Sequence, residues 1–289
     1  MRSSTALARA RVILSAVALL GAFAGHAAAE DTAATGNAAA TADLAAAAQN
    51  PIAAMVSLPF QNNTFFRTGP DNDTANVLNI QPVVPFNFGE WNVITRTIVP
   101  LIYLPSVTGS LPEVPSGGES GDHFGLGDIN ISAFLSPVSE GEFTWGVGPS
   151  LSLRTATTDR IGTQKWSAGP TAVGLVIDKP WVAGVLVRHL WSFAGKSDRQ
   201  DVNQTLIQPF VNYNLPQGWY LVTSPIMTAN WKADKDNALL VPVGGGFGRV
   251  FNVAGQAINA NIQAYYNAVH PEFAPEASLR LQLTFLFPK

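Results

Sequence analysis

Apolar and polar residues alternate along most of this 289-residue chain, and this alternation constrains the fold more than any other feature. It is clearest over residues 143–155 and over the C-terminal residues 279–287. In the C-terminal stretch, leucine and phenylalanine occupy the odd positions, whereas Arg280, Gln282 and Thr284 occupy even positions. Because successive side chains of a β-strand point to opposite faces, this period of two predicts strands with one apolar face.

The segments that connect these predicted strands alternate strictly between long and short. The long connections span residues 67–73, 106–123, 156–165, 195–201, 232–237 and 270–276, and the short ones span residues 88–91, 138–141, 178–180, 216–218 and 254–256. Six long and five short connections join twelve strands, so both chain ends emerge on the short-turn side. This pattern is typical of outer-membrane barrels, in which closure leaves no unpaired strand edge in hydrocarbon. We therefore predict an all-β fold, a transmembrane antiparallel up-and-down β-barrel of about twelve strands.

The composition agrees with a membrane-embedded wall of strands. Charged residues make up only 13% of the chain and hydrophobic residues 47%, whereas a soluble domain usually contains about 25% charged residues. After residue 29, no stretch reaches the length of about 18 apolar residues that a membrane-spanning helix requires. The absence of cysteine excludes a disulfide framework and thiolate metal sites.

The spacing of aromatic residues gives a second indication of a membrane-spanning wall. Trp219 and Trp231 lie twelve residues apart on one face of a predicted strand, and Trp181 and Phe193 repeat this spacing on another. Twelve strand residues extend about 40 Å, which a tilt of roughly 45° reduces to about 28 Å of height. That height is close to the ~25 Å apolar band between the aromatic girdles of outer-membrane barrels.

The N-terminal residues 1–29 have the features of an export signal. Arg2, Arg9 and Arg11 are followed by the apolar core VILSAVALLGAFAG and by three alanines before Glu30. Without this leader the chain has 14 basic and 20 acidic residues, a net charge of −6. No basic patch remains, which argues against a nucleic-acid partner. Export of such a barrel predicts a location in the outer membrane of a Gram-negative bacterium.

The chain after the leader divides into two predicted parts. Residues 30–48 are rich in alanine and are predicted to form a linker or a short helix, and residues 49–289 are predicted to form the barrel. Asn50 and Pro51 are alternatively suited to begin a helix, as N-cap and first helical residue. Residues 41–57 are candidates for a plug inside the barrel.

Eight prolines fall inside the predicted strands, where proline is unfavourable because it cannot donate to the hydrogen-bond ladder. They are Pro59, Pro82, Pro100, Pro149, Pro170, Pro209, Pro225 and Pro242. We predict that they form bulges that bend the wall. The alternative is a weakened seam through which apolar solutes leave sideways.

Motifs that would indicate catalysis or cofactor binding are weak. The run GGGFGR at residues 244–249 lacks the Lys-Ser/Thr ending of a phosphate-binding loop, and we interpret it as part of a curved strand. His123, His189 and His270 show no metal-ligand spacing, and no GxSxG elbow supports a barrel hydrolase. The sequence therefore predicts no catalytic residue, no cofactor and no metal.

Several segments resemble a family of outer-membrane transporters named for the meta-pathway of phenol degradation. They are QNPIAAMVSLPFQNNT, VLNIQPVVPF, WNVITRTIVP, GLGDINISAFLSP, WGVGPSLSLRTAT, WSFAG, QPFVNYNLPQGWYL, VPVGGGFGRVF and FLFPK, and together they span residues 49–289. The resemblance implies an outer-membrane barrel that passes small aromatic or apolar compounds. It supplies no residue-level functional site.

The alternation assigns one set of polar side chains to the lumen. The predicted lumen-lining residues are Asp128, Asn130, Arg154, Arg188, Gln204, Gln208, Asn212, Asn259, Asn261, Gln263, Arg280 and Gln282. Either they line a water-filled pore, or they bond to one another and to a plug. We predict a monomeric channel in outer-membrane lipid for passive passage of small solutes. A structural barrel that binds partners through its loops is the alternative, and a barrel hydrolase is a third.

Overall fold

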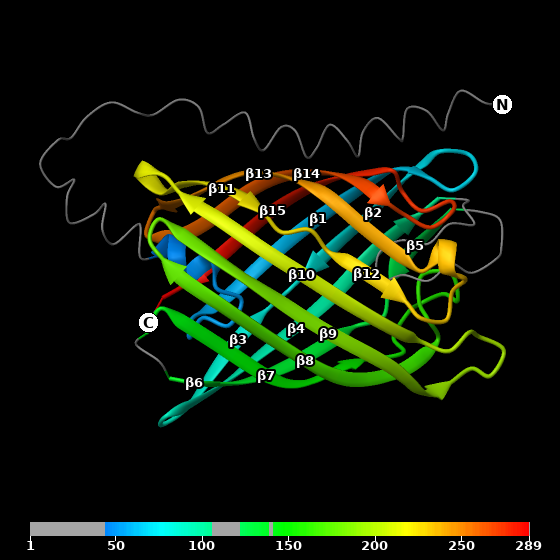
Figure 1. The fold of residues 1–289 in the computed structure, drawn as a ribbon, viewed down its shortest axis with the longest axis horizontal. Helices are drawn as coiled ribbons and strands as arrows, with labels where there is room; N and C mark the ends of the chain where they lie inside the picture. The colour runs from blue at the N-terminus through cyan, green and yellow to red at the C-terminus, as the bar shows by residue number, and fades with distance from the viewer. Residues whose placement is uncertain (1–43, 106–121, 139–140, 289) are drawn as a thin grey trace, which may run out of the picture. The chain divides into compact units, whose positions relative to one another are not determined.

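The computed structural model describes residues 44–105, 122–138 and 141–288, which form a closed antiparallel β-barrel (Figure 1). The predicted signal peptide, residues 30–43 and most of the connection 106–123 lie outside the described residues. The strand segments are β1 (Val56–Thr68), β2 (Asp73–Ile80), β3 (Val83–Phe88), β4 (Trp91–Leu104), β5 (His123–Leu126), β6 (Asn130–Pro137), β7 (Phe143–Ser152), β8 (Lys165–Asp178), β9 (Trp181–Gly195), β10 (Asn203–Asn214), β11 (Trp219–Thr223), β12 (Met227–Asn230), β13 (Leu239–Val253), β14 (Gln256–Val269) and β15 (Ala277–Phe287).

Three wall strands are each interrupted once, so the fifteen segments make twelve strands around the barrel. β2 continues into β3, β5 into β6, and β11 into β12, and each of these pairs lies against the same neighbouring strand. The all-β fold class and the predicted number of strands are therefore confirmed.

The barrel closes where the last strand pairs with the first. β15 lies antiparallel to β1 from Val56 opposite Phe287 to Phe66 opposite Ala277, without a register shift. Across this seam Phe60 and Phe285 meet edge to face on the outer wall, with ring centroids 6.1 Å apart. The terminal LRLQLTFLF segment thus closes the wall, because its backbone groups pair with β1 on one side and with β14 on the other.

The prediction that the strand prolines form bulges is confirmed only at Pro242, beside a register shift in β13. Pro82 and Pro225 fall between segments and interrupt their wall strands, because a residue without an N–H cannot continue the ladder. The prediction of bulges is wrong for the other five, which lie within paired strands without an adjacent register shift: Pro59, Pro100, Pro149, Pro170 and Pro209.

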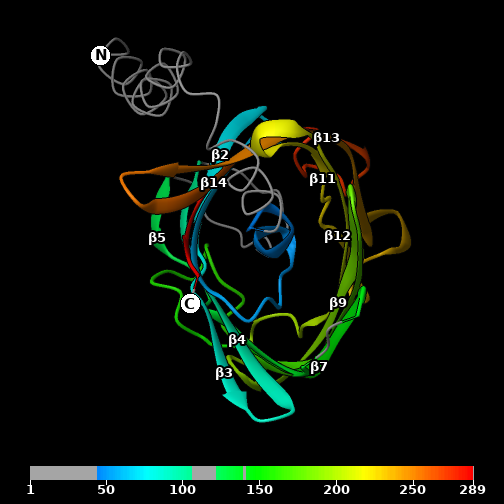
Figure 2. The same ribbon diagram turned by 90° about the vertical axis from the view of Figure 1, so that its left-hand side faces the viewer.

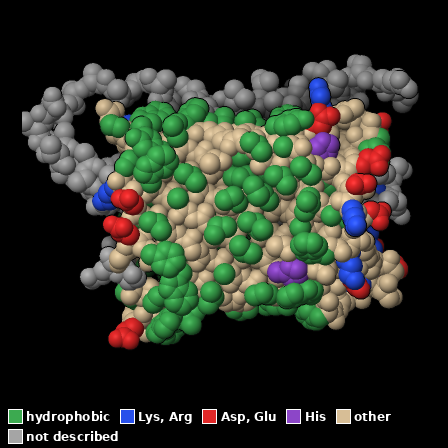
Figure 3. Space-filling model, in the orientation of Figure 1, with side chains coloured by type: hydrophobic (Ala, Val, Ile, Leu, Met, Phe, Trp, Pro, Cys, Tyr) green, Lys and Arg blue, Asp and Glu red, His purple; other side chains and the backbone are tan. Residues whose placement is uncertain are grey.

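The outer wall is apolar across its middle. Along β9, Trp181, Val185, Val187 and Trp191 are 37–49% exposed and alternate with buried residues that face the lumen. Figure 3 shows hydrophobic side chains spread over the visible face and charged side chains gathered at its two ends. None of the helices in the described part of the chain is long and apolar enough to cross a membrane, a criterion that does not apply to strands.

A short helix over residues 44–49 lies inside the barrel, as the end view shows (Figure 2). Ala45 packs against Tyr220 and Leu286, and Ala46 belongs to a second apolar cluster on the inner wall. The helix ends before Asn50, whose side chain accepts a hydrogen bond from a backbone N–H two residues later. The predicted short N-terminal helix is therefore confirmed, with residues 44–49 as its described part, and a helix beginning at Asn50 is wrong.

The glycine-rich run 244–249 lies within β13, as predicted, and a Cβ on any of its four glycines would clash with a neighbouring atom, most closely at Gly246. A Cβ on Gly246 would lie 1.8 Å from the carbonyl oxygen of Ile262 on the neighbouring strand. On Gly174 in β8, the nearest atom would be 3.6 Å away, an ordinary contact with Phe143. The run therefore allows β13 and β14 to approach closely.

We expect Gly246→Ala to lower the free energy of unfolding by about 1–3 kcal/mol, because the added methyl group forces the two strands apart. Urea unfolding in detergent, followed by heat-modifiable gel mobility, measures the change. The matched control Gly174→Ala should stay within about 0.5 kcal/mol of the wild type. Equal stability of the two variants would contradict the close approach of β13 and β14.

Candidate functional site

The lumen contains three adjoining cavities, with volumes of about 160, 90 and 30 Å³. The first lies beside the helix 44–49, and the second lies beside the connection 153–164. The smallest joins them, because it shares lining residues with both. It shares Gln61, Gln81, Arg96, Leu186 and Gln208 with the first cavity, and Asn79, Ile98, Arg188 and Ile226 with the second.

Each of three arginines lines two of these cavities. Arg96 lines the first and the smallest, Arg188 lines the second and the smallest, and Arg280 lines the first and the second. They come from β4, β9 and β15, three strands that do not pair with one another in the wall. These three residues therefore lie where one cavity meets the next.

Arg280 is held by the surrounding wall in a fixed position. Its Nε donates to Asn63 Oδ1 at 3.0 Å, and its Nη1 donates to the backbone oxygen of Ser224 at 2.8 Å. The guanidinium also lies over the ring of Tyr265, 5.3 Å from the ring centroid. A charge over an aromatic face is stabilised electrostatically. Because Arg280 is only 6% exposed, these contacts occur in an environment with little water.

Arg188 and Arg96 are bonded to side-chain amide oxygens. Arg188 Nη1 donates to Asn130 Oδ1 at 2.8 Å, and Arg96 Nη2 donates to Gln81 Oε1 at 2.7 Å. Asn130 Oδ1 also accepts from Ser150, so a polar network extends around the inner wall. Bonds to a charged donor are stronger than neutral ones, and they orient these arginines relative to the cavities.

The helix at one end of the lumen is fastened to the wall by a reciprocal amide pair. Gln49 Nε2 donates to Asn214 Oδ1 at 2.8 Å, and Asn214 Nδ2 donates back to Gln49 Oε1 at 3.2 Å. Asn214 ends β10, beside a short turn, so the helix occupies the short-turn end of the first cavity.

The connection 153–164 folds into the other end of the lumen. Ile161 is fully buried and packs against Phe65, Val77 and Ile102 on the inner wall. The Asp128 carboxylate holds this connection, because it accepts bonds from the backbone N–H of Ala156 and from the N–H and hydroxyl of Thr163. The lumen is therefore narrowed at both ends by the chain itself.

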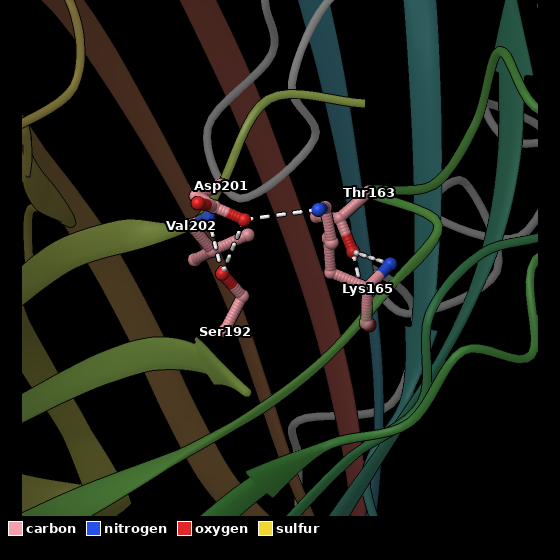
Figure 4. Close-up of polar contacts among 5 residues, drawn as sticks. All are labelled: Thr163, Lys165, Ser192, Asp201 and Val202. Atoms are coloured by element: carbon pink, nitrogen blue, oxygen red, sulfur yellow. Dashed lines mark hydrogen bonds and ion pairs between the residues drawn. The ribbon is translucent and has the colours of Figure 1, made fainter. Parts of the chain in front are cut away.

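An ion pair fastens the same connection to the next one along the chain (Figure 4). Lys165 Nζ lies 2.9 Å from Asp201 Oδ1, and Ser192 also donates to this carboxylate. The hydrogen bond from Lys165, together with its positive charge, lowers the pKa of Asp201. Thr163 Oγ1 accepts a bond from the backbone N–H of Lys165 and so connects the pair to the Asp128 contacts.

Eleven of the twelve predicted lumen residues line a described cavity. The first cavity includes Gln208, Asn212, Asn259, Asn261, Gln263, Arg280 and Gln282, and the second includes Asp128, Asn130, Arg188 and Gln204. Arg154 lies elsewhere, because β7 ends at Ser152 and the exposed Arg154 side chain donates to Gln164 in the following connection. The structure thus brings these eleven residues together around the cavities and separates Arg154 from them.

The alternation of apolar and polar residues did not show on which face of its strand Arg96 lies. It also did not show that the connection 153–164 folds into the lumen. On β4 the inner face includes Ile94, Ile98 and Ile102 beside Arg96, so both faces of this strand are apolar and the period of two disappears. Ile161 is an isolated apolar residue in a polar connection, and this was the available signal for an inward fold.

Among the described residues, no group of three or more His, Asp or Glu side chains is arranged to hold a metal ion. His189 lies on the outer face of β9 beside Trp191, with ring centroids 4.1 Å apart and the rings tilted by 47°, and its Nδ1 is 2.7 Å from Thr205 Oγ1.

The fold and lumen define a closed twelve-stranded β-barrel whose interior is partly filled by its own chain. The COG4313 outer membrane channel from Pseudomonas putida F1 is similar, with a TM-score of 0.61 and 16% identity over 82% of this chain and 97% of that chain. CdiB from Acinetobacter baumannii has a TM-score of 0.36 and 9% identity over 81% of this chain and 60% of that chain. OccK11 from Pseudomonas aeruginosa has a TM-score of 0.32 and 9% identity over 81% and 95%. No family model and no curated protein matches the chain.

We expect Gln49→Ala and Asn214→Ala each to raise the single-channel conductance or the frequency of open events in planar bilayers. Each substitution removes the amide pair that holds the helix, at a cost of about 1–3 kcal/mol for the two bonds. The double variant should change no more than either single variant, because both remove the same interaction. Asn87→Ala, at the exposed end of β3, serves as the control. Additive effects would argue against a shared contact.

We expect Asp128→Ala to release the connection 153–164 and to make the bond after Arg160 a site of trypsin cleavage. Arg160 is 3% exposed in the native barrel, so trypsin reaches it only when the connection leaves the lumen. Mass spectrometry of a timed digest identifies the cut. Asp178→Ala, at the exposed end of β8, should leave this bond protected. Protection in the Asp128 variant as well would show that the carboxylate does not hold the connection.

Proposed function

We propose that this protein is an outer-membrane channel through which small molecules with an apolar or aromatic body pass passively. The main support for this function is the combination of an apolar outer wall with a lumen that contains adjoining cavities. The first property suits a wall in contact with lipid, and the second suits the passage of solutes. We further propose that the chain acts as a monomer, since the barrel closes on itself.

The walls of the second cavity support the apolar part of this proposal. Its lining combines amides with apolar side chains: Phe65, Val77, Ile98, Ile102, Ile161, Leu190, Ile226 and Leu240. Small-molecule sites are commonly lined by apolar groups with a few placed polar ones. The helix at one end and the connection 153–164 at the other leave too little room for large hydrated solutes.

The similarity in fold to a channel of the outer membrane supports the same function. The resemblance of residues 49–289 to transporters named for phenol degradation supports an aromatic solute. The location in a Gram-negative outer membrane follows from the predicted export signal and the apolar wall. None of these features requires a cofactor or an energy source.

The proposal predicts faster entry of a small aromatic alcohol into vesicles that contain the protein. Vesicles with lipopolysaccharide in the outer leaflet are suitable, because this leaflet slows the entry of apolar solutes. Radiolabelled benzyl alcohol should enter several-fold faster than into protein-free vesicles, whereas a disaccharide should not. Equal benzyl alcohol entry with and without the protein would exclude the channel function for this class of solute.

A further inference from the structure

A patch of polar side chains interrupts the apolar outer wall where β9 and β10 approach the long connection 195–201. His189 lies opposite Thr205 in the strand register, and Trp191 lies opposite Asn203. The chain neighbours of Asn203 and Thr205 line the second and the smallest cavity, so these two side chains face outward. Polar groups on a face that contacts hydrocarbon are unfavourable, so their presence there points to a function.

Two tryptophans flank this patch, one on each side of β10. The backbone N–H of Trp231 donates to the carbonyl oxygen of Asn203 at 2.8 Å, on the side of β10 away from Trp191. Trp231 Nε1 donates to Thr205 Oγ1 at 2.8 Å, and the same hydroxyl lies 2.7 Å from His189 Nδ1. Trp191 and Trp231 are 49% and 60% exposed. The polar side chains therefore lie between two exposed aromatic rings.

Two polar atoms of the patch are buried without a hydrogen-bond partner among the described residues. They are Nε2 of His189 and Oδ1 of Asn203. An unpaired buried polar atom costs free energy, so the large majority of such atoms in folded proteins are bonded. A ligand that supplies a donor to Asn203 and a second polar group to His189 would satisfy both atoms. The patch therefore has the bonding capacity of a binding site.

The position of the patch along the wall indicates which ligand it meets. At the short-turn end of the same two strands, the outward side chains are Trp181 and Tyr213, with ring centroids 4.7 Å apart. Such rings are the usual aromatic girdle at a membrane boundary. Long connections of outer-membrane barrels face outside the cell, so the polar patch meets the outer leaflet, which contains lipopolysaccharide. Lys232, which is exposed and follows Trp231, adds a positive charge at this end.

We propose that the patch binds the lipid A head group of lipopolysaccharide, which is an acylated and phosphorylated amino sugar. An amide N–H and a hydroxyl of the sugar bond to Asn203 Oδ1 and His189 Nε2. The C–H face of the sugar packs on the exposed indoles of Trp191 and Trp231, which rotate to admit the head group to the two buried atoms. Lys232 contacts a phosphate. The site lies on the outer wall and is independent of the solute that the lumen passes.

Lipid A and cardiolipin test this proposal, because each carries two phosphates and only lipid A carries sugar rings. Native mass spectrometry of the purified protein in detergent, with equal amounts of the two lipids, gives their relative affinities. The wild type should bind lipid A about tenfold more tightly than cardiolipin, since only the sugar stacks on the indoles and bonds to the amide. Equal binding of the two lipids would overturn the proposal.

Three variants locate the site. Asn203→Ala and Trp191→Leu should each weaken lipid A binding about fivefold, through the loss of one hydrogen bond or one stacked ring, and leave cardiolipin binding unchanged. The matched control Trp181→Leu removes an outward indole from the other end of β9 and should bind lipid A as the wild type does. Heat-modifiable gel mobility establishes that each variant is folded. If Trp191→Leu fails to fold, Asn203→Ala and His189→Phe decide.

Lipid A binding that is unchanged in the folded patch variants would overturn the site. An equal loss in Trp181→Leu would also overturn it, because the lipid would then bind the whole wall and not this patch. Binding is measured without transport, so the result is separate from the channel function. Sugar-dependent binding at the patch without entry of benzyl alcohol would leave the lipid site standing and exclude the channel.

Discussion

The pairing of β15 with β1 is the contact on which the rest of the structure depends. An open sheet of twelve strands would expose two edges, and its inner face would be accessible to solvent. Once Gln61 lies opposite Gln282 at the seam, every wall strand has a neighbour on both sides and the inner face encloses a lumen. The polar residues of the even-numbered face of β15 are then buried together with those of β1. Closure therefore creates both the apolar outer wall and the need to fill the interior.

The interior is filled in two ways, and the difference determines where the cavities lie. At the two ends, the helix 44–49 and Ile161 bring apolar groups against apolar inner walls, where burial is favourable. In the middle, buried amides and arginines bond to one another, because an unpaired buried polar group is costly. Long polar side chains that must satisfy such bonds pack less completely than alkyl groups. The cavities adjoin this polar middle, and the chain itself narrows both ends.

The sequence predicted the fold well because alternation and loop length are local properties. The twelve strands, the closing role of residues 279–287 and eleven of the lumen residues follow from the period of two. The pattern assigned Arg96 to neither face of its strand, because β4 is apolar on both faces. Arg154 lines none of the described cavities, because β7 ends at Ser152, before the alternation in the sequence ends. The inward fold of 153–164 depends on Asp128 and on distant strands. No local pattern shows such a contact.

The burial of Arg188 and Arg280 is difficult to explain by stability alone. Taking a charge out of water costs several kcal/mol, and a buried charge replaced by packed apolar groups often leaves a protein as stable or more stable. Apolar packing is used at other positions of the inner wall, where Phe134 and Leu186 are buried in an apolar cluster. Arg188 nonetheless lies on the same inner face of β9 as Leu186, two residues further along the strand. Its hydrogen bond to Asn130 joins β9 to β6, two strands that do not pair in the wall, and packed apolar side chains would not supply such a directional contact. On this argument the polar middle of the barrel holds distant strands of the wall in a fixed arrangement, and the apolar ends support it.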